Sequence, residues 1–297
     1  MSARTVAALQ LAPLASLIRL PLALMVAVTA LAGALAAGAR PAGLTLWGLF
    51  WGVFLLAAAA SILNQVRERT TDALMRRTAG RPLACGRLAP AGGTAIGLLA
   101  AGGGLAVLTA ATGPATTLLG LAALAWYLAV YTPLKRATSL AVLAGTPCGA
   151  VPPLMGWLAA GGALPAPQPL ALALVMLLWQ VPHYWLLAIP DRAELRAAGF
   201  RVLPELGDRQ LVAVSRRWIV ALALATALLP LLAIPAHPPA QGAVAGLALA
   251  LAGGNAWLAR RERFAVTAAR RLRHLLHLHL ALVLLAILAG TVAARSF

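Results

Sequence analysis

Long apolar runs recur along this chain, and they restrict its fold more than any other feature. Each run is about 20 residues long and is followed by a short polar connection, which is the length that a helix needs to cross a hydrocarbon core of about 30 Å. An open sheet edge is not tolerated in lipid. The sequence therefore predicts an all-α, polytopic membrane protein with a single integral membrane domain over residues 1–297. The nine expected transmembrane helices cover residues 18–38, 44–63, 90–110, 115–133, 139–160, 167–188, 213–234, 240–258 and 274–294.

The first run resembles a secretory signal peptide, because it follows Arg4 and Arg19 and ends in alanine-rich sequence. It is long for the apolar region of a signal peptide, so we interpret it as a retained first span. Cys85 and Cys148 are too few for a disulfide framework and lack metal-ligand spacing, so we expect them to be reduced and structural.

The basic residues predict the orientation in the membrane. Most of the 24 Lys and Arg residues fall in the connections after the second, fourth, sixth and eighth spans, whereas only Arg40 and Arg295 fall on the other side. The positive-inside rule then places the N-terminus inside and the C-terminus outside. The formal net charge of +17 does not indicate nucleic-acid binding, because it is spread over membrane loops without a soluble module. Membrane lipids with anionic headgroups are the expected counterions.

The acidic residues, which the positive-inside rule does not govern, collect on the same side. The chain has only seven, and six of them occupy two connections, so we expect the chemistry there, on the cytoplasmic side. They are Glu68 and Asp72 in the first connection and Asp191, Glu194, Glu205 and Asp208 in the second.

The end of the second span presents a line of oxygen-bearing side chains. Asn64, Glu68 and Asp72 are spaced by four residues, so on a helix they project from one face. Hard oxygen ligands of this kind suit Mg²⁺, which usually shares its coordination shell with phosphates and water, and the pattern predicts a metal-bridged diphosphate. The alternative is a solvated helix end whose carboxylates pair with nearby arginines such as Arg76.

Basic residues follow this segment at once. Arg77 and Arg81 stand in the stretch Met75-Arg76-Arg77-Thr78-Ala79-Gly80-Arg81-Pro82-Leu83. A guanidinium group binds phosphate oxygens through two parallel hydrogen bonds, so these arginines are candidates for diphosphate contact.

At this point the sequence resembles the UbiA superfamily of intramembrane prenyltransferases, and within it the branch of the protohaem IX farnesyltransferases, or haem O synthases. The superfamily motif Asn-x-x-x-Asp-x-x-x-Asp reads Asn64, Glu68, Asp72 here, and the branch stretch Met-x-Arg-Thr-x-x-Arg-Pro-Leu matches residues 75–83. Further similar blocks lie at residues 131–138, 149–157, 179–185 and 197–204. Three positions depart from the pattern: Glu68 replaces Asp, Glu194 stands in for a member of the second acidic motif, and Ala141 replaces Asn.

The resemblance implies a nine-helix bundle in the bacterial cytoplasmic membrane, with farnesyl diphosphate and haem B as substrates and Mg²⁺ as cofactor. It implies that farnesyl is added to a haem vinyl group together with water. It also implies a haem A synthase or a cytochrome oxidase assembly protein as a candidate partner. The implied residues are Asn64, Glu68 and Asp72 for one metal ion, Asp191 and Glu194 for a second, Arg77, Arg81, Lys135 and Arg136 for the diphosphate, Tyr131 beside Lys135 in the catalytic site, and His183 for the haem or a substrate carboxylate.

Two other functions remain open at this point. A related prenyltransferase could act on a quinone or phenolic acceptor. A transporter would need carboxylates near the middle of the membrane, and no acidic residue falls within an expected span. His274, His277 and His279 open the last span and are interpreted as an interfacial cluster rather than a metal or haem contact.

Overall fold

The computed structural model describes residues 12–38, 41–201, 204–262 and 264–294. All regular secondary structure within these residues is helical, without a strand. Eight helices are long and apolar enough to cross a membrane, and a ninth span results if one bent pair is counted as a single span. The prediction of a polytopic all-α protein is therefore confirmed. Arg40 and Arg295, the two basic residues expected on the outer side, lie outside the described residues.

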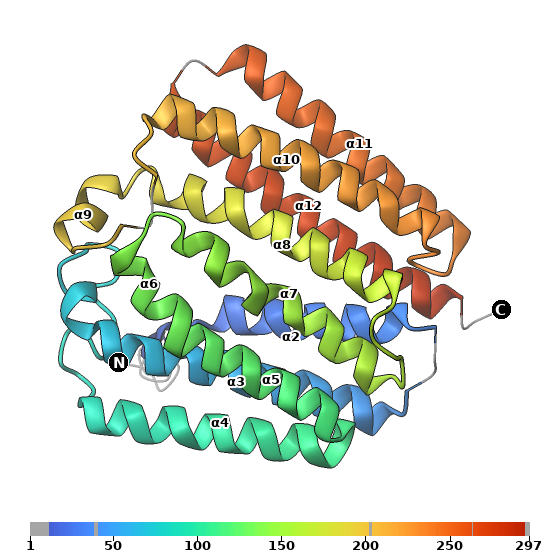
Figure 1. Cartoon of the computed structure of the whole chain (residues 1–297), viewed down its shortest axis with the longest axis horizontal. Coiled ribbons are helices and arrows are strands. Elements are labelled where there is room, and N and C mark those ends of the chain that lie inside the picture. The colour runs from blue at the N-terminus through green and yellow to red at the C-terminus, as the bar shows by residue number, and fades with distance from the viewer. Residues whose placement is uncertain (1–11, 39–40, 202–203, 263, 295–297) are drawn as a thin grey trace, which may run out of the picture.

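The helices run nearly side by side as a bundle of long rods (Figure 1). Most helix bounds agree with the apolar runs to within a few residues. Two helices differ by nine residues: α3 continues beyond the expected end at 63 and carries the polar segment as regular helix as far as Asp72, and α12 begins at Ala265 instead of 274. The helices are α2 (Leu20–Ala36), α3 (Gly43–Asp72), α4 (Pro90–Thr112), α5 (Pro114–Trp126), η1 (Tyr127–Tyr131), α6 (Thr132–Ala137), α7 (Ala141–Ala159), α8 (Pro167–Ala188), α9 (Arg192–Ala197), α10 (Asp208–Leu231), α11 (Pro238–Arg261) and α12 (Ala265–Ala293).

The first span is broken at Arg19. A short helix, Ala12–Ile18, meets α2 at an angle of 51°, and Arg19 between them has left-handed backbone angles of φ 51° and ψ 55°. Residues other than glycine rarely adopt this conformation, so surrounding contacts must hold it. One such contact is Gln65 on α3, whose Nε2 donates to the carbonyl oxygen of Leu17 at 2.7 Å.

A π-helical turn interrupts the fourth span at its polar end. The segment η1 joins α5 to α6, and Pro133, which has no N–H to donate, stands just after it. The carbonyl oxygen of Leu128 within η1 accepts a hydrogen bond from Arg67 Nη1 on α3 at 2.7 Å. Such bulges often occur at functional sites, and this one presents Tyr127 and Tyr131.

Two glycines allow a close contact between α2 and α7. A Cβ atom on Gly156 of α7 would lie 1.8 Å from the carbonyl oxygen of Ala30 on α2, and one on Gly33 of α2 would lie 2.0 Å from the carbonyl oxygen of Pro153 on α7. Small residues let membrane helices approach in this way, because packing rather than the hydrophobic effect drives their association in lipid. The α2–α7 contact forms one wall of the cavity described below.

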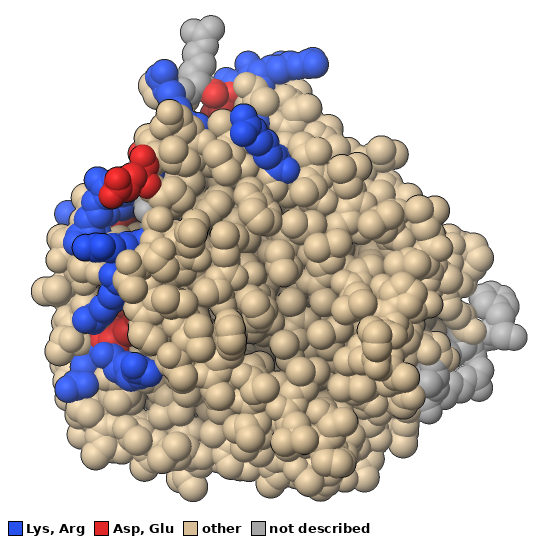
Figure 2. All heavy atoms as spheres, in the orientation of Figure 1, with Lys and Arg blue, Asp and Glu red and all other residues tan. Residues whose placement is uncertain are grey.

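Charged side chains gather at one end of the bundle and leave most of the visible surface uncharged (Figure 2). That end carries the loop 73–89, α6 and α9 (Figure 1). The observation agrees with the charge pattern of the sequence. The direction of this end relative to the cytoplasm stays a prediction.

Candidate active site

A polar pocket of about 130 Å³ lies at the charged end of the bundle. It is enclosed by the end of α3, the loop that follows it, η1 and α6, and the connection from α8 to α9. All but three of the predicted site residues line this pocket; the exceptions are Arg136, His183 and Glu194. The residues that line it are Asn64, Glu68, Asp72, Arg77, Arg81, Lys135 and Asp191, with Tyr131 beside them and Arg19 in addition.

The last two turns of α3 form one wall of the pocket, as the spacing predicted. Asn64, Glu68 and Asp72 line it from a single helix face, and Asn64 Nδ2 donates to Glu68 Oε2 at 2.8 Å. The exposed fractions of these residues are only 5%, 6% and 2%. Buried carboxylates are costly unless they are paired, so their partners decide how the site is held together.

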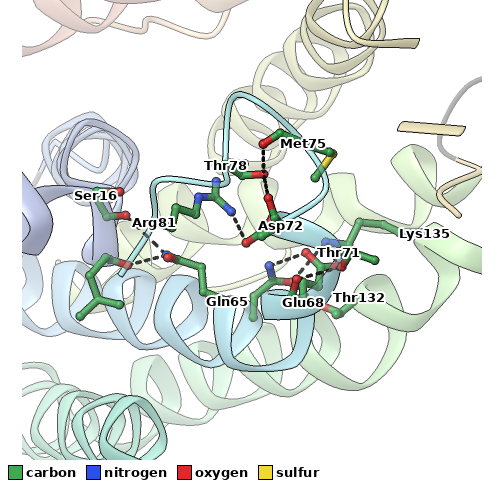
Figure 3. Close-up of polar contacts among 12 residues, drawn as sticks. Ser16, Gln65, Glu68, Thr71, Asp72, Met75, Thr78, Arg81, Thr132 and Lys135 are labelled. Atoms are coloured by element: carbon green, nitrogen blue, oxygen red, sulfur yellow. Dashed lines mark hydrogen bonds and ion pairs between the residues drawn. The ribbon is translucent and has the colours of Figure 1, made fainter. Parts of the chain in front are cut away.

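Each of the two buried carboxylates has a basic partner from another segment (Figure 3). Lys135 Nζ lies 2.6 Å from Glu68 Oε1 and donates to Asn64 Oδ1 at 3.2 Å. Arg81 Nη1 donates to Asp72 Oδ2 at 2.7 Å. The side chains of Lys135 and Arg81 are themselves largely buried, with exposed fractions of 12% and 14%, so all these charges lie in a partly dehydrated pocket.

The loop after α3 positions Arg81 through a tight turn. Thr78 Oγ1 donates to the carbonyl oxygen of Asp72 at 2.8 Å, and the backbone N–H of Arg81 donates to the carbonyl oxygen of Thr78 at 3.0 Å. Thr78 is 1% exposed. The Thr78 hydroxyl thus fixes the loop to the end of α3, and a residue without a hydroxyl group between Arg77 and Arg81 would lose this hydrogen bond.

The second acidic segment approaches the same pocket, but only in part. Asp191 lines the pocket and accepts a hydrogen bond from Arg77 Nε at 3.1 Å. Glu194 does not line it, because its carboxylate binds the backbone N–H and the guanidinium of Arg76, both at 3.0 Å. Arg136 also lies outside the pocket lining, and its Nη2 donates to Thr71 Oγ1 at 3.3 Å.

The pocket suits a hard cation that is shared with a phosphate group. Its oxygen donors are two carboxylates and an amide on α3 with a third carboxylate, Asp191, opposite. Within the described residues, no three His, Cys, Asp or Glu side chains converge closely enough to hold a metal ion alone. Mg²⁺ usually takes one or two carboxylates and completes its shell with substrate phosphates and water, so this donor set fits a cation that arrives with its phosphate.

Arg19 is a site residue that the sequence analysis treated only as a flanking charge. It lines the polar pocket together with Asp72 and the tyrosines. Phe200 was also missed; its ring lies 5.8 Å from Lys135 Nζ and 5.9 Å from the guanidinium carbon of Arg136. A lone arginine inside an apolar stretch was the only signal for Arg19, because its left-handed backbone and its distance from the acidic motifs are not visible in sequence.

An apolar cavity of about 150 Å³ adjoins the polar pocket. It is lined mainly by α2, α3, α5, α7 and α8, and His183 belongs to this cavity and not to the polar pocket. The chain has three tyrosines, and all of them line both spaces: Tyr127, Tyr131 and Tyr184. They form a tyrosine collar between a charged compartment and an apolar one.

A membrane helix bundle with these two adjoining compartments suits a ligand that has an anionic head and an apolar tail. The UbiA prenyltransferase family matches residues 24–280, and the chain belongs to this family. The resemblance found in the sequence is thereby confirmed, and the chain is an intramembrane prenyltransferase. It is 48% identical over 216 residues to a protein of Geobacter sulfurreducens named "Protoheme IX farnesyltransferase", an alignment that covers 72% of this chain and 79% of that protein.

Solved structures share the fold over nearly the whole chain. A digeranylgeranylglyceryl phosphate synthase superposes with a TM-score of 0.74 at 16% identity, covering 95% of this chain and 99% of that one. A UbiA homologue from Archaeoglobus fulgidus bound to GPP and Mg²⁺ superposes with a TM-score of 0.66 at 16% identity, covering 93% and 99%. These similarities confirm the fold that the sequence predicted.

Proposed function

We propose that this chain transfers a farnesyl group from farnesyl diphosphate to a vinyl group of protohaem IX (haem B) and thereby forms haem O. One observation carries the proposal: the tyrosine collar joins a basic, carboxylate-lined pocket to an apolar cavity. Such a shape suits a diphosphate head and a prenyl tail. The choice of acceptor rests on the relatives, because several that are 37–48% identical carry the name protohaem IX farnesyltransferase.

The reaction requires that the carbon–oxygen bond to the diphosphate breaks and that the oxygen keeps the electron pair. Lys135, Arg77 and Arg81 line the polar pocket and are assigned to the diphosphate oxygens, where their positive charge stabilises the leaving group as it becomes more negative. Arg136 is assigned to the rim of this site, since it contacts Thr71 on α3. Tyr131 places its ring centroid 5.2 Å from Lys135 Nζ and so helps to hold the ammonium group in the pocket.

A bound Mg²⁺ would supply Lewis-acid neutralisation of the diphosphate charge. Asn64, Glu68 and Asp72 would hold it on the α3 side, and Asp191 is assigned to a second cation on the opposite side. Glu194 completes the second set only if it leaves Arg76, whose side chain is 95% exposed and therefore weakly held in the pair.

The farnesyl tail is assigned to the apolar cavity and its first carbon to the tyrosine collar. Aromatic faces attract a cation through their quadrupoles, and the rings of Tyr127 and Tyr131 lie 5.3 Å apart. The haem vinyl group then forms the new carbon–carbon bond, and a water molecule adds to the resulting vinyl-derived cation and releases one proton. Apolar walls keep other water away from the allylic cation before this step.

The charged end is assigned to the cytoplasmic side of a bacterial inner membrane, with the N-terminus inside and the C-terminus outside. This orientation follows from the basic connections. A haem A synthase or a cytochrome oxidase assembly protein as partner stays a prediction from the resemblance.

The direct test incubates the purified protein with haem B, farnesyl diphosphate and Mg²⁺ and identifies the pigments by mass spectrometry. We expect a hydroxyethylfarnesyl haem. Prenylated quinone precursors without farnesylated haem would refute the proposed acceptor. In the same assay Asp72→Ala should abolish turnover, whereas Glu262→Ala, which removes a carboxylate paired with Arg271 outside the pocket, should leave it unchanged.

A further inference from the structure

Two histidines that are far apart in the sequence lie in contact near the charged end of the bundle. His183 on α8 and His277 on α12 have ring centroids 4.9 Å apart, with one ring edge directed at the other at 74°. Trp179, one turn before His183, stacks on it at 4.5 Å and 14° and also meets His277 edge-on at 5.7 Å. The Trp179 indole is fixed in turn, because its Nε1 donates to the carbonyl oxygen of Leu276 at 2.9 Å.

The two imidazoles have different surroundings. His183 lines the apolar cavity, and its Nδ1 atom is buried without a hydrogen-bond partner within the part of the chain that the structure describes. His277 is exposed on the outside of α12. On the same helix, His279 is buried and its Nε2 is hydrogen-bonded to Thr226 at 3.1 Å. Its Nδ1, like that of His183, has no partner among the described residues, but His279 lines neither the apolar cavity nor the polar pocket. The pair therefore connects the apolar cavity to the protein surface.

A buried nitrogen without a partner is costly, and imidazole nitrogen is a common ligand of iron. A bare metal ion would need more protein ligands than the pair supplies, and no three His, Cys, Asp or Glu side chains among the described residues form such a group. A metalloporphyrin supplies four nitrogen ligands itself and needs only one axial side chain. An iron porphyrin is thus the ligand chemistry that this pair fits.

We propose that His183 is the axial ligand that holds the iron of the haem acceptor in the cavity, and that His277 is the ligand that haem meets first as it enters from the membrane between α8 and α12. This inference rests on the proposed function, because it assigns a place to that acceptor. Iron bound at His183 puts the porphyrin rim beside Tyr184, whose ring lies 5.3 Å from that of His183. Tyr184 belongs to the tyrosine collar, where the first carbon of the farnesyl group is assigned.

The surroundings also suit the other groups of a haem. Arg273 stands four residues before His277 on α12, about one helical turn nearer the charged end. Arg273 at that end can pair with a propionate group, while the vinyl-bearing part of the ring stays among apolar side chains. The cavity of about 150 Å³ is smaller than usual ligand pockets of roughly 300–1,000 Å³, so the porphyrin enters only as α8 and α12 move apart.

The test compares haemin with metal-free protoporphyrin IX, because only haemin has an iron to ligate. The full-length protein is reconstituted in lipid nanodiscs, and haemin binding is followed by the Soret absorbance and by electron paramagnetic resonance. We expect His183→Ala to weaken haemin binding by about tenfold or more, to change the spectrum of any haemin that binds and to leave protoporphyrin IX binding unchanged. Added imidazole should restore the wild-type spectrum to His183→Ala. His183→Gln, which keeps a polar side chain without imidazole, should behave like His183→Ala and guards against a variant that fails to fold.

His277→Ala should slow haemin uptake from liposomes and leave the final spectrum unchanged. His274→Ala is the matched control, since His274 is exposed on the same helix one turn earlier and has no ring contact with His183 among the contacts described. Wild-type spectra and affinities in both His183 variants would overturn the axial assignment, and unchanged uptake in His277→Ala would overturn the entry assignment. If the wild type farnesylates haem but the His183 spectra do not change, only this inference fails. If His183 binds haemin but no farnesylated haem forms, only the proposed function fails.

Discussion

The pair of Asp72 and Arg81 allows the charge of the site to be separated from its contribution to the fold. Asp72 is 2% exposed, and its Oδ2 accepts a hydrogen bond from Arg81 Nη1 at 2.7 Å. Asp72→Asn keeps the shape of the side chain, removes the negative charge and leaves the guanidinium without its partner. Breaking a fully buried pair costs about 3–5 kcal/mol, but Arg81 retains some exposure to the pocket. We therefore expect a loss of about 1–3 kcal/mol in the free energy of unfolding.

The effect on activity should be larger, because the carboxylate faces the place where charge develops. Loss of one group that stabilises transition-state charge lowers kcat by about 10²–10³, which corresponds to roughly 3–4 kcal/mol at 1.4 kcal/mol for each factor of ten. Farnesyl transfer at saturating Mg²⁺ and farnesyl diphosphate measures this loss. Glu262→Gln serves as the control, since it removes an acidic residue from an arginine pair outside the pocket.

The double variant Asp72→Asn/Arg81→Gln distinguishes the two roles. It leaves no unpaired charge, so its stability in detergent, measured by thermal unfolding, should return to within about 1 kcal/mol of the wild type. Its activity should not recover, because neither the carboxylate nor the guanidinium is left to act on the diphosphate. If activity returned together with stability, Asp72 would serve only to hold the fold, and the metal and diphosphate assignments would be wrong.

Two further predictions concern packing and orientation. Gly156→Leu should lower the unfolding free energy by about 1–3 kcal/mol or more, because even a Cβ atom there would lie 1.8 Å from the carbonyl oxygen of Ala30. The control is Gly246→Ala, where a Cβ atom meets nothing within 4 Å. This variant should be neutral or slightly stabilising in thermal unfolding. Cys85 is exposed, and the hydrogen bond from Arg87 Nε lowers the pKa of its thiol. A larger fraction of this thiol is therefore thiolate at pH 7, so a membrane-impermeant maleimide should label Cys85 quickly. Labelling should be slower in Arg87→Ala. The reagent should reach Cys85 from the cytoplasmic side only, and labelling restricted to the other side would contradict the proposed orientation.

The helices could be predicted because hydropathy reports contact with lipid directly. Hydropathy alone could not predict where α3 ends, because the last turns of this helix are buried by protein rather than by lipid. The buried charges of Glu68 and Asp72 look like a loop in a hydropathy pattern, but Lys135 and Arg81 from other segments neutralise them inside a helix. Hydropathy does not record partners that approach from elsewhere in the chain.

Local sequence patterns do not record contacts between distant segments, and this explains which site residues the sequence predicted correctly. The spacing of Asn64, Glu68 and Asp72 is a local property of one helix, so the sequence predicted their common face. The position of Glu194 depends on Arg76, more than a hundred residues earlier, and spacing carries no information about such a choice. The sequence analysis treated arginine pairing and metal binding at the α3 carboxylates as alternatives. In the structure the two are compatible, because the ion-paired carboxylates also line the pocket that suits a cation and a phosphate.

The ion pairs in the polar pocket determine how the pocket accepts its substrate. Its lining contains one more basic than acidic residue, so the empty pocket is close to neutral and can stay folded without a ligand. A diphosphate with one divalent cation is an anion of small net charge, and it can enter if the bases turn from carboxylates to phosphate oxygens while the carboxylates turn to the cation. Every ion pair that stabilises the empty pocket thus becomes two contacts with the bound substrate. The ion pairs are Arg81 with Asp72, Lys135 with Glu68 and Arg77 with Asp191, and Arg19 is the additional basic residue of the lining.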